Sequence, residues 1–281
     1  MVSTTADVKP GRQSASGYAY QIPATILGNI CAVSGKFSGK LDGATEISGS
    51  LVLSGPLGKK AVGSFKGFRS YGYSYPGVFI GGDLVTGGGL ISGTANVEVG
   101  GATNTSGTHA LVEPCAGANL DAKAASDYFR GLPPGQSLPE VEVAGAAVTT
   151  LTVGPGIQVF STPSINIKSK RYEGYPTGGT LQIVLDPNTI VAVINVEEKI
   201  TIGNAGSIVV VGDPAAVVIN VHGAGDKPGK IKIGKGAIVD PPIVAPAAKV
   251  TISAGAVTSN VFGSIKIGIK GGGIGDVLGC H

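Results

Sequence analysis

Apolar and polar positions alternate in short runs through residues 180–269. Val, Ile and Thr fill every second position of these runs, and Gly, Pro, Asn or Asp residues separate one run from the next. A period of two is typical of β-strands, in which β-branched residues are favoured. The runs read LQIVL, TIVAVINV, KITIG, SIVVVG, AVVINVHG, KIKIG, KVTIS and SIKIGIK. We therefore predict a succession of strands with little other structure between them.

The connections between these runs are short, as at residues 186–188, 203–206 and 212–214. Connections of this length cannot contain crossover helices, so the chain turns after each strand. This pattern favours a solenoid or a sandwich over a doubly wound sheet. Shorter β runs closed by glycine, such as EISGSLVLSG, extend the same pattern toward the N-terminus.

One segment between the two β-rich halves has helical spacing instead. Ala122, Ala125 and Phe129 recur at intervals that place them on one helix face, and Gly131 marks the end. We predict a helix near residues 119–131 whose Ala and aromatic face packs on a sheet, because a lone helix of this length is marginal in water. The fold class is then all-β, a β-solenoid-like single domain over residues 18–270 with one packed α-helix.

The two ends of the chain lack this periodicity. Residues 1–17 are polar and aperiodic, so we predict a disordered N-terminal segment. They contain neither the basic nor the apolar part of a signal peptide, and no apolar run in the chain is long enough for a membrane span. Residues 271–281 are rich in glycine, and we predict a flexible tail there.

Composition adds two constraints. Gly contributes 47 of the 281 residues, which fits tightly stacked turns. Charged residues make up only 14% of the chain. The net charge of +3 and the lack of a long basic run argue against a nucleic-acid partner. A surface poor in charge repels its own copies weakly, so we expect the protein to associate with itself as a homo-oligomer or lattice.

Three cysteines, Cys31, Cys115 and Cys280, stand far apart and without the spacing of a metal site, so we predict no metal and no cofactor. An odd number leaves at least one thiol without a partner in the same chain. Cys280, in the glycine-rich tail, is the first candidate for an intermolecular disulfide, and Cys31 and Cys115 are the others. Such a bond persists only in an oxidising compartment. Three reduced thiols without a role are the alternative.

Aromatic residues concentrate at Tyr71, Tyr73 and Tyr75, which would share one face of an extended segment. These tyrosines are candidates for an assembly surface or for contact with a sugar ring. The alternative, which the pattern favours, is an aromatic ladder that covers the end of the core.

Candidate catalytic residues do not form a recognisable set, so we predict that the protein is not an enzyme. Glu197 and Glu198 are adjacent and would point to opposite faces of a strand, whereas a glycosidase needs two converging acids. Asp186 and Asp213 each precede a proline and are typical of turns. His222 precedes a glycine, which favours a histidine at the edge of a turn over a base or a ligand.

Lysines alternate with isoleucine in the runs KIKIGK and SIKIGIK. This spacing places them on the outer face of strands. A solvated face that also blocks edge pairing is favoured over a patch for an anionic ligand. The residues are Lys230, Lys232, Lys235, Lys266 and Lys270.

Two glycine- and valine-rich segments carry a family resemblance. Residues 77–101 read GVFIGGDLVTGGGLISGTANVEVGG, and residues 241–268 read PPIVAPAAKVTISAGAVTSNVFGSIKIG. Both resemble segments of the choice-of-anchor A family of bacterial surface proteins. This resemblance implies a fold similar to that of ice-binding β-solenoids. The family resemblance implies a surface anchor after the domain, where this chain has GGGIGDVLGCH. An anchorless domain with spare thiols is similar instead to a fungal protein that forms vacuolar crystals implicated in gravity sensing.

These observations together predict a non-enzymatic structural protein that assembles into large ordered particles or crystals, disulfide-linked and vacuolar or secreted. The alternative is an extracellular surface adhesion or ligand-binding module. Ice binding and a polysaccharide-acting enzyme rank below both. Ice binding would need a regular array of short residues, and Thr149, Thr150 and Thr152 form the only dense threonine run.

Overall fold

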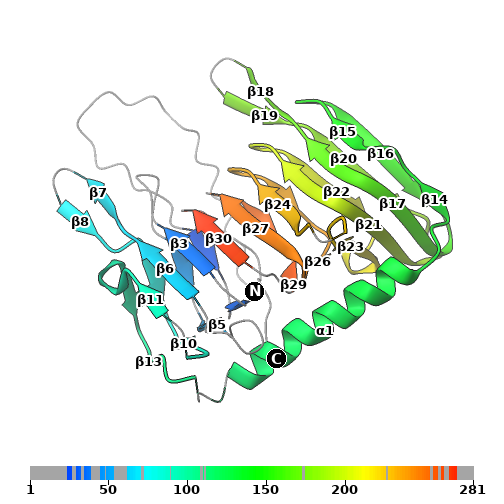
Figure 1. Cartoon of the computed structure of the whole chain (residues 1–281). Helices are drawn as coiled ribbons and strands as arrows, with labels where there is room; N and C mark the ends of the chain where they lie inside the picture. Colours follow the sequence, from blue (N-terminus) through cyan, green and yellow to red (C-terminus); the bar gives the residue numbers. More distant parts are fainter. Residues whose placement is uncertain are drawn as a thin grey trace.

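The computed structural model describes residues 24–26, 30–32, 35–38, 45–47, 49–53, 62–70, 73–88, 90–107, 110, 112–172, 175–225, 227–253, 256–258, 261–262 and 266–270. Parallel strands stack in successive coils and form three sides, with one helix along one of them (Figure 1). This is the predicted β-solenoid with one packed helix, and the fold class is confirmed.

Each side contains strands from both halves of the chain. The side under the helix contains β14 (Gln136–Ser137), β17 (Gly156–Ile167), β21 (Thr189–Ile202), β23 (Val217–Val221), β26 (Ile243–Val244), β29 (Val261–Phe262), β2 (Ile30–Ala32), β5 (Leu51–Leu53), β10 (Leu84–Thr86) and β13 (Thr103–Asn104). β17 and β21 are long and bend into the next side.

The second side continues with the far ends of β17 and β21. Its other strands are β15 (Val141–Val143), β24 (Gly229–Ile233), β27 (Ala248–Ser253), β30 (Lys266–Lys270), β3 (Gly35–Ser38), β6 (Val62–Lys66) and β11 (Leu90–Ser92). The third side consists of two sheets. One contains β16 (Val148–Val153), β20 (Thr180–Leu185), β22 (Ser207–Val211), β25 (Ile238–Val239) and β28 (Val257–Thr258), and the other contains β1 (Ala24–Ile26), β4 (Thr45–Ile47), β9 (Val78–Ile80) and β12 (Val97–Val99).

The core is a column of branched apolar side chains in register from coil to coil. Ile200, Ile231, Val250 and Ile267 are paired on successive strands, and each is at most 2% exposed. The alternate Val and Ile positions of the sequence therefore point inward, as predicted. Burial of each such side chain contributes about 1.5–3 kcal/mol.

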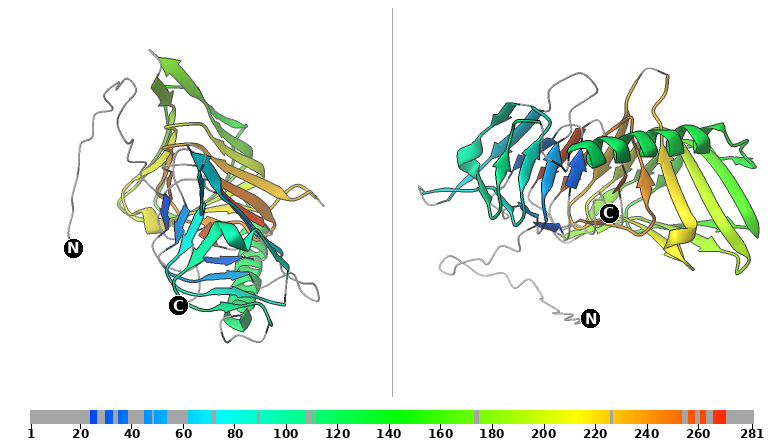
Figure 2. Two further views of the ribbon diagram at one scale, coloured as in Figure 1. Left: turned by 90° about the vertical axis from the view of Figure 1, so that its left-hand side faces the viewer. Right: turned by 90° about the horizontal axis from the view of Figure 1, so that it is seen from below.

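The two halves of the chain meet in the middle of the stack. β3 pairs in parallel with β30, so the coils of the N-terminal half lie directly beside the last coil of the C-terminal half. The helix α1 (Val112–Gly131) follows the N-terminal coils and runs along the stack to the far end, where β14 begins (Figures 1 and 2). A helix of 20 residues is about 30 Å long, which is enough to pass about six strands of a sheet.

The helix begins earlier than predicted. It ends at Gly131 as expected, but it starts at Val112 and not near Asn119. Pro114 and Gly117 concealed this start, because both residues disfavour helix interiors. Proline is tolerated in the first turn of a helix, where its missing N–H has no partner to lose. No helix in the described part of the chain is long and apolar enough to cross a membrane.

Two antiparallel hairpins and two short 3-10 helices interrupt the coils. The hairpins are β7 (Phe68–Ser70) with β8 (Tyr73–Tyr75), and β18 (Ser169–Tyr172) with β19 (Tyr175–Gly178). The 3-10 helices are η1 (Thr94–Asn96) and η2 (Pro214–Ala216). Asp213 caps η2 by accepting from the N–H of Ala215, and Asp186 accepts from the N–H of Asn188, so both aspartates are turn residues as predicted.

The turn before η1 depends on a glycine. Gly93 has a φ of 75°, and a Cβ at this position would press on the carbonyl oxygen of Phe65 in the next coil. We expect Gly93→Ala to lower the free energy of unfolding by about 1–3 kcal/mol, from backbone strain and this clash. Urea denaturation measures the change. Gly131→Ala is the control, because a Cβ there meets nothing within 4 Å. Equal urea midpoints of unfolding for the two variants would contradict the close contact between Gly93 and the backbone of Phe65.

Candidate functional site

The five-stranded sheet of the third side, formed by β16, β20, β22, β25 and β28, contains no charged residue in any of its strands. We call its outer surface the uncharged face. Three rows of side chains cross it, each from coil to coil. The first row is Val148, Thr180, Ser207, Ile238 and Val257; the second is Thr150, Gln182 and Val209; the third is Thr152, Val184 and Val211.

Large apolar side chains remain exposed on this face. Val148 is 64% exposed, Val257 53%, Val211 46% and Ile238 44%. They are four of the eight large apolar side chains that are exposed in the described part of the chain. Because exposed apolar groups that gather on one surface usually mark a contact site, this face is the first candidate for function.

The uncharged face is also regular and stiff. β16, β20 and β22 pair without a register shift, whereas the pairing of β17 with β21 is shifted twice. Neighbouring residues of a row are therefore about 4.8 Å apart, and successive rows about 6.6 Å apart. β-branched side chains dominate the rows, and these have few rotamers. The Thr180 and Ser207 hydroxyls lie 2.9 Å apart and fix one another.

One carboxylate lies at the margin of this face. Asp240 follows β25, and its side chain accepts from the backbone N–H of Val210 at 3.2 Å. The face therefore offers methyl groups, hydroxyls and one amide, and no titratable group within its strands. Such a surface is suited to an uncharged, flat ligand that it contacts through many weak interactions.

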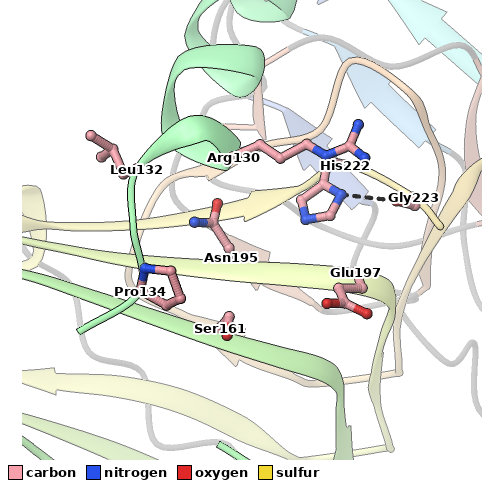
Figure 3. A pocket seen from close by; sticks show the side chains of 8 residues that line it. All are labelled: Arg130, Leu132, Pro134, Ser161, Asn195, Glu197, His222 and Gly223. Carbon is pink, nitrogen blue, oxygen red and sulfur yellow. Dashed lines mark hydrogen bonds between the residues drawn. The ribbon is translucent and has the colours of Figure 1, made fainter. Parts of the chain in front are cut away.

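A second candidate is a pocket of about 390 Å³ at the C-terminal end of the helix (Figure 3). Residues from the end of α1, the segment after it, β17, β21 and the turn after β23 line this pocket. They are Arg130, Leu132, Pro134, Ser161, Asn195, Glu197, His222 and Gly223.

The polar groups of this pocket do not form a catalytic set. The Nδ1 atom of His222 lies 2.8 Å from the carbonyl oxygen of Gly223, and the Ser161 hydroxyl faces that of Ser137 at 3.4 Å. Within the described residues no hydrogen bond joins Ser161 to His222, so a nucleophile and its base are not paired. Glu197 is the single carboxylate of the lining, whereas paired-acid hydrolysis needs two.

Buried amides beside this pocket hold the helix on the sheet. Asn220 donates to the carbonyl oxygen of Ser126 at 3.1 Å and to Oδ1 of Asn195 at 2.8 Å, and it accepts from the Ser126 hydroxyl at 2.6 Å. Asn195 donates to the carbonyl oxygen of Phe129 at 2.8 Å. Ser126 and the two asparagines were not predicted to take part in this contact between helix and sheet. Their signal was an asparagine at the same place in two apolar runs, TIVAVINV and AVVINV.

Most residues that the sequence singled out lie away from the uncharged face. Tyr73 and Tyr75 lie in the β7–β8 hairpin, and Tyr71 lies outside the described residues. Cys31 lies in β2, and Cys115 lies in α1. Cys280 lies outside the described residues. An intermolecular disulfide and an assembly surface at the tyrosines stay predictions.

The acidic and histidine candidates are also placed. Glu197 and Glu198 are both exposed where β21 bends between two sides, so they do not point to opposite faces as predicted. His222 directly follows β23 and precedes Gly223, whose φ is 80°, which confirms a histidine at the edge of a turn. Among the described residues no group of three or more His, Cys, Asp or Glu side chains is placed to hold a metal ion.

Sequence reasoning found part of the uncharged face. Thr150 and Thr152 point outward, while Thr149 is paired with buried Leu181 on the inner side. The rest of the face was missed, because its outward positions contain valine and isoleucine as well as threonine. The available signal was the run SIVVV, where apolar residues occupy both the inward and the outward positions of β22.

No family model matches the chain, and no curated protein matches it either. A solved structure with a similar arrangement is the ice-binding protein of an Arctic yeast, with a TM-score of 0.48 and 12% identity over 92% of this chain and 93% of that one. The ice-binding protein of Shewanella frigidimarina has a TM-score of 0.46 and 14% identity over 90% of this chain and 93% of that one. A third is the ice-binding protein of the Antarctic ascomycete Antarctomyces psychrotrophicus, with a TM-score of 0.40 and 11% identity over 92% of this chain and 93% of that one.

These findings correct the predicted function. The similar structures are ice-binding proteins, so the prediction of a vacuolar, crystal-forming protein with a role in gravity sensing is wrong. Ice binding, which the sequence ranked below its main alternative, fits better. The resemblance to the choice-of-anchor A family and to the fungal crystal protein OCTIN is not confirmed. What the comparisons share with the predicted resemblance is the β-solenoid domain.

Proposed function

We propose that the uncharged face binds ice. The observation that carries this proposal is a regular outer surface of five strands without a charged residue, on which branched apolar side chains stay exposed beside hydroxyls. The distant likeness to ice-binding structures does not by itself extend their activity to this chain.

The physical reason is the chemistry of ice as a ligand. Ice presents a rigid plane of water molecules with no net charge, so a side chain that must keep its own hydration shell interferes with contact. Methyl groups gain by leaving liquid water, and hydroxyls such as those of Thr180 and Ser207 can share hydrogen bonds with ordered water. Each contact is weak, but on a stiff grid all of them form together.

A crystalline polysaccharide is the other flat and uncharged ligand, and this face suits it less. Sugar rings are commonly held by aromatic side chains, whose faces offer a large apolar area. None of the five strands of the uncharged face contains an aromatic residue. The lack of aromatic residues therefore favours ice over a polysaccharide as the ligand of this face.

The growth of single ice crystals in a supercooled solution tests this proposal. We expect the protein to shape the crystals into faceted forms and to hold their growth at temperatures slightly below the melting point. A globular protein of similar mass at the same concentration is the control and should leave the crystals as round discs. Round discs with this protein, at concentrations up to the millimolar range, would contradict ice binding.

A further inference from the structure

The second side of the solenoid carries a ladder of lysines. Lys199, Lys230, Lys249 and Lys266 are paired directly, each with the next, on the neighbouring strands β21, β24, β27 and β30. Lys232 lies two residues beyond Lys230 on the same outer surface. Neighbouring strands are about 4.8 Å apart, so the ladder places one positive charge per coil along the solenoid axis.

The sequence favoured a solvated face that also blocks edge pairing, and the blocking of edges does not explain the ladder. β24, β27 and β30 are interior strands of their sheet, and each is paired on both sides. Lysines that discourage edge-to-edge aggregation belong on unpaired edges. The lysines here cover the middle of a face.

The ladder also lacks neutralising partners. Lys199, Lys230, Lys232 and Lys249 form no ion pair with any residue in the part of the chain that the structure describes, where the lysine ion pairs join Lys168 to Glu142 and Lys123 to Asp127. Like charges directly opposite each other on paired strands destabilise a sheet. A surface kept only for solubility would intersperse both signs. This arrangement is therefore suited to a ligand whose negative charges repeat along a line.

We propose that this lysine face binds a linear acidic polysaccharide that lies along the solenoid axis, with its carboxylates or sulfates on the lysine ladder. The residues between the lysines support this partner: Thr201, Thr251 and Ser253 offer hydroxyls to sugar hydroxyls and leave room for a chain to lie close. The four strands of the ladder contain no arginine for bidentate phosphate contacts and no aromatic residue for stacking bases, which disfavours a nucleic acid.

Binding to polygalacturonate, a linear polymer with one carboxylate per ring, tests the proposal. We expect the protein to bind this polymer at low ionic strength, to bind more weakly as salt is added, and to ignore the fully methyl-esterified polymer. Lys230→Gln/Lys249→Gln should weaken binding about tenfold or more, which corresponds to about 1.4 kcal/mol. Lys123→Gln/Arg130→Gln removes the same charge from α1, on another side of the solenoid, and should change the affinity by less than about twofold.

Three results would overturn the proposal. The first is equal binding of the esterified polymer, because contact would then not depend on charge. The second is equal loss of affinity in the two double variants, because net charge and not the ladder would then decide. The third is tighter binding of single-stranded poly-thymidylate than of polygalacturonate, which would assign the face to a nucleic acid. Ice shaping by Lys230→Gln/Lys249→Gln should equal that of the parent protein, which separates this proposal from the function of the uncharged face.

Discussion

Replacing Asn220 by alanine is expected to lower the free energy of unfolding by about 3–5 kcal/mol. Asn220 is fully buried and takes part in three hydrogen bonds with Ser126 and Asn195. Its loss leaves the Ser126 hydroxyl and the Asn195 carboxamide oxygen, both of buried residues, without these partners. Each buried polar group left unpaired costs about 1–3 kcal/mol.

Chemical denaturation of Asn220→Ala measures this effect, with Asn188→Ala as the matched control. Asn188 is exposed in the turn before β21, and its replacement should change stability by no more than about 0.5 kcal/mol. Similar midpoints for the two variants would show that the buried amides do not hold the helix on the sheet.

The strands were predictable from the sequence because the solenoid imposes one rule on every coil. Inward positions such as Ile231 and Ile233 must be apolar, and Lys230 and Lys232 between them face water. That rule is local, so a period of two reveals it. The turns at Asp186 and Asp213 were also predictable from local sequence, because each aspartate accepts a hydrogen bond from the backbone N–H two residues ahead.

The order of the coils was not predictable. The pairing of β3 with β30 joins residues from opposite ends of the chain, and nothing in either strand specifies the other. The helix was found only in its last part, because packing on the sheet outweighs the poor helix propensity of Gly117. The helix was predicted to contact the sheet through apolar side chains. Ala122 is buried as expected, but Ala125 and Phe129 are only half-buried, and polar Ser126 is buried beside them.

The candidate site was harder to predict than the fold. An ice-binding array was sought as a dense threonine run, which found Thr150 and Thr152. The face is instead assembled from one short strand per coil, and Ile238 and Val257 join it only because their strands stack in register. Residues so far apart in the sequence carry no common local signal.

Placing a positive charge within the uncharged face is expected to abolish ice binding. Thr180 lies on β20 between Val148 and Ser207, so Thr180→Lys puts an ammonium group inside the first row of side chains. The ammonium group keeps its hydration shell, and removing that shell on contact with ice, without a compensating partner, costs several kcal/mol. A cost of about 1.4 kcal/mol already lowers the affinity tenfold. Thr180 is half-buried on an outer surface, and the fold should tolerate the change.

The most direct measurement of the central claim is the fraction of protein taken up by a slowly growing ice surface, compared for Thr180→Lys and Thr251→Lys. The second variant makes the identical substitution on the lysine face, in β27 beside Lys232. We predict that Thr251→Lys enters the ice as the parent protein does, while uptake of Thr180→Lys falls at least about tenfold, toward that of a protein without affinity for ice. Equal uptake of the two variants, or a loss confined to Thr251→Lys, would contradict the assignment of ice binding to the uncharged face.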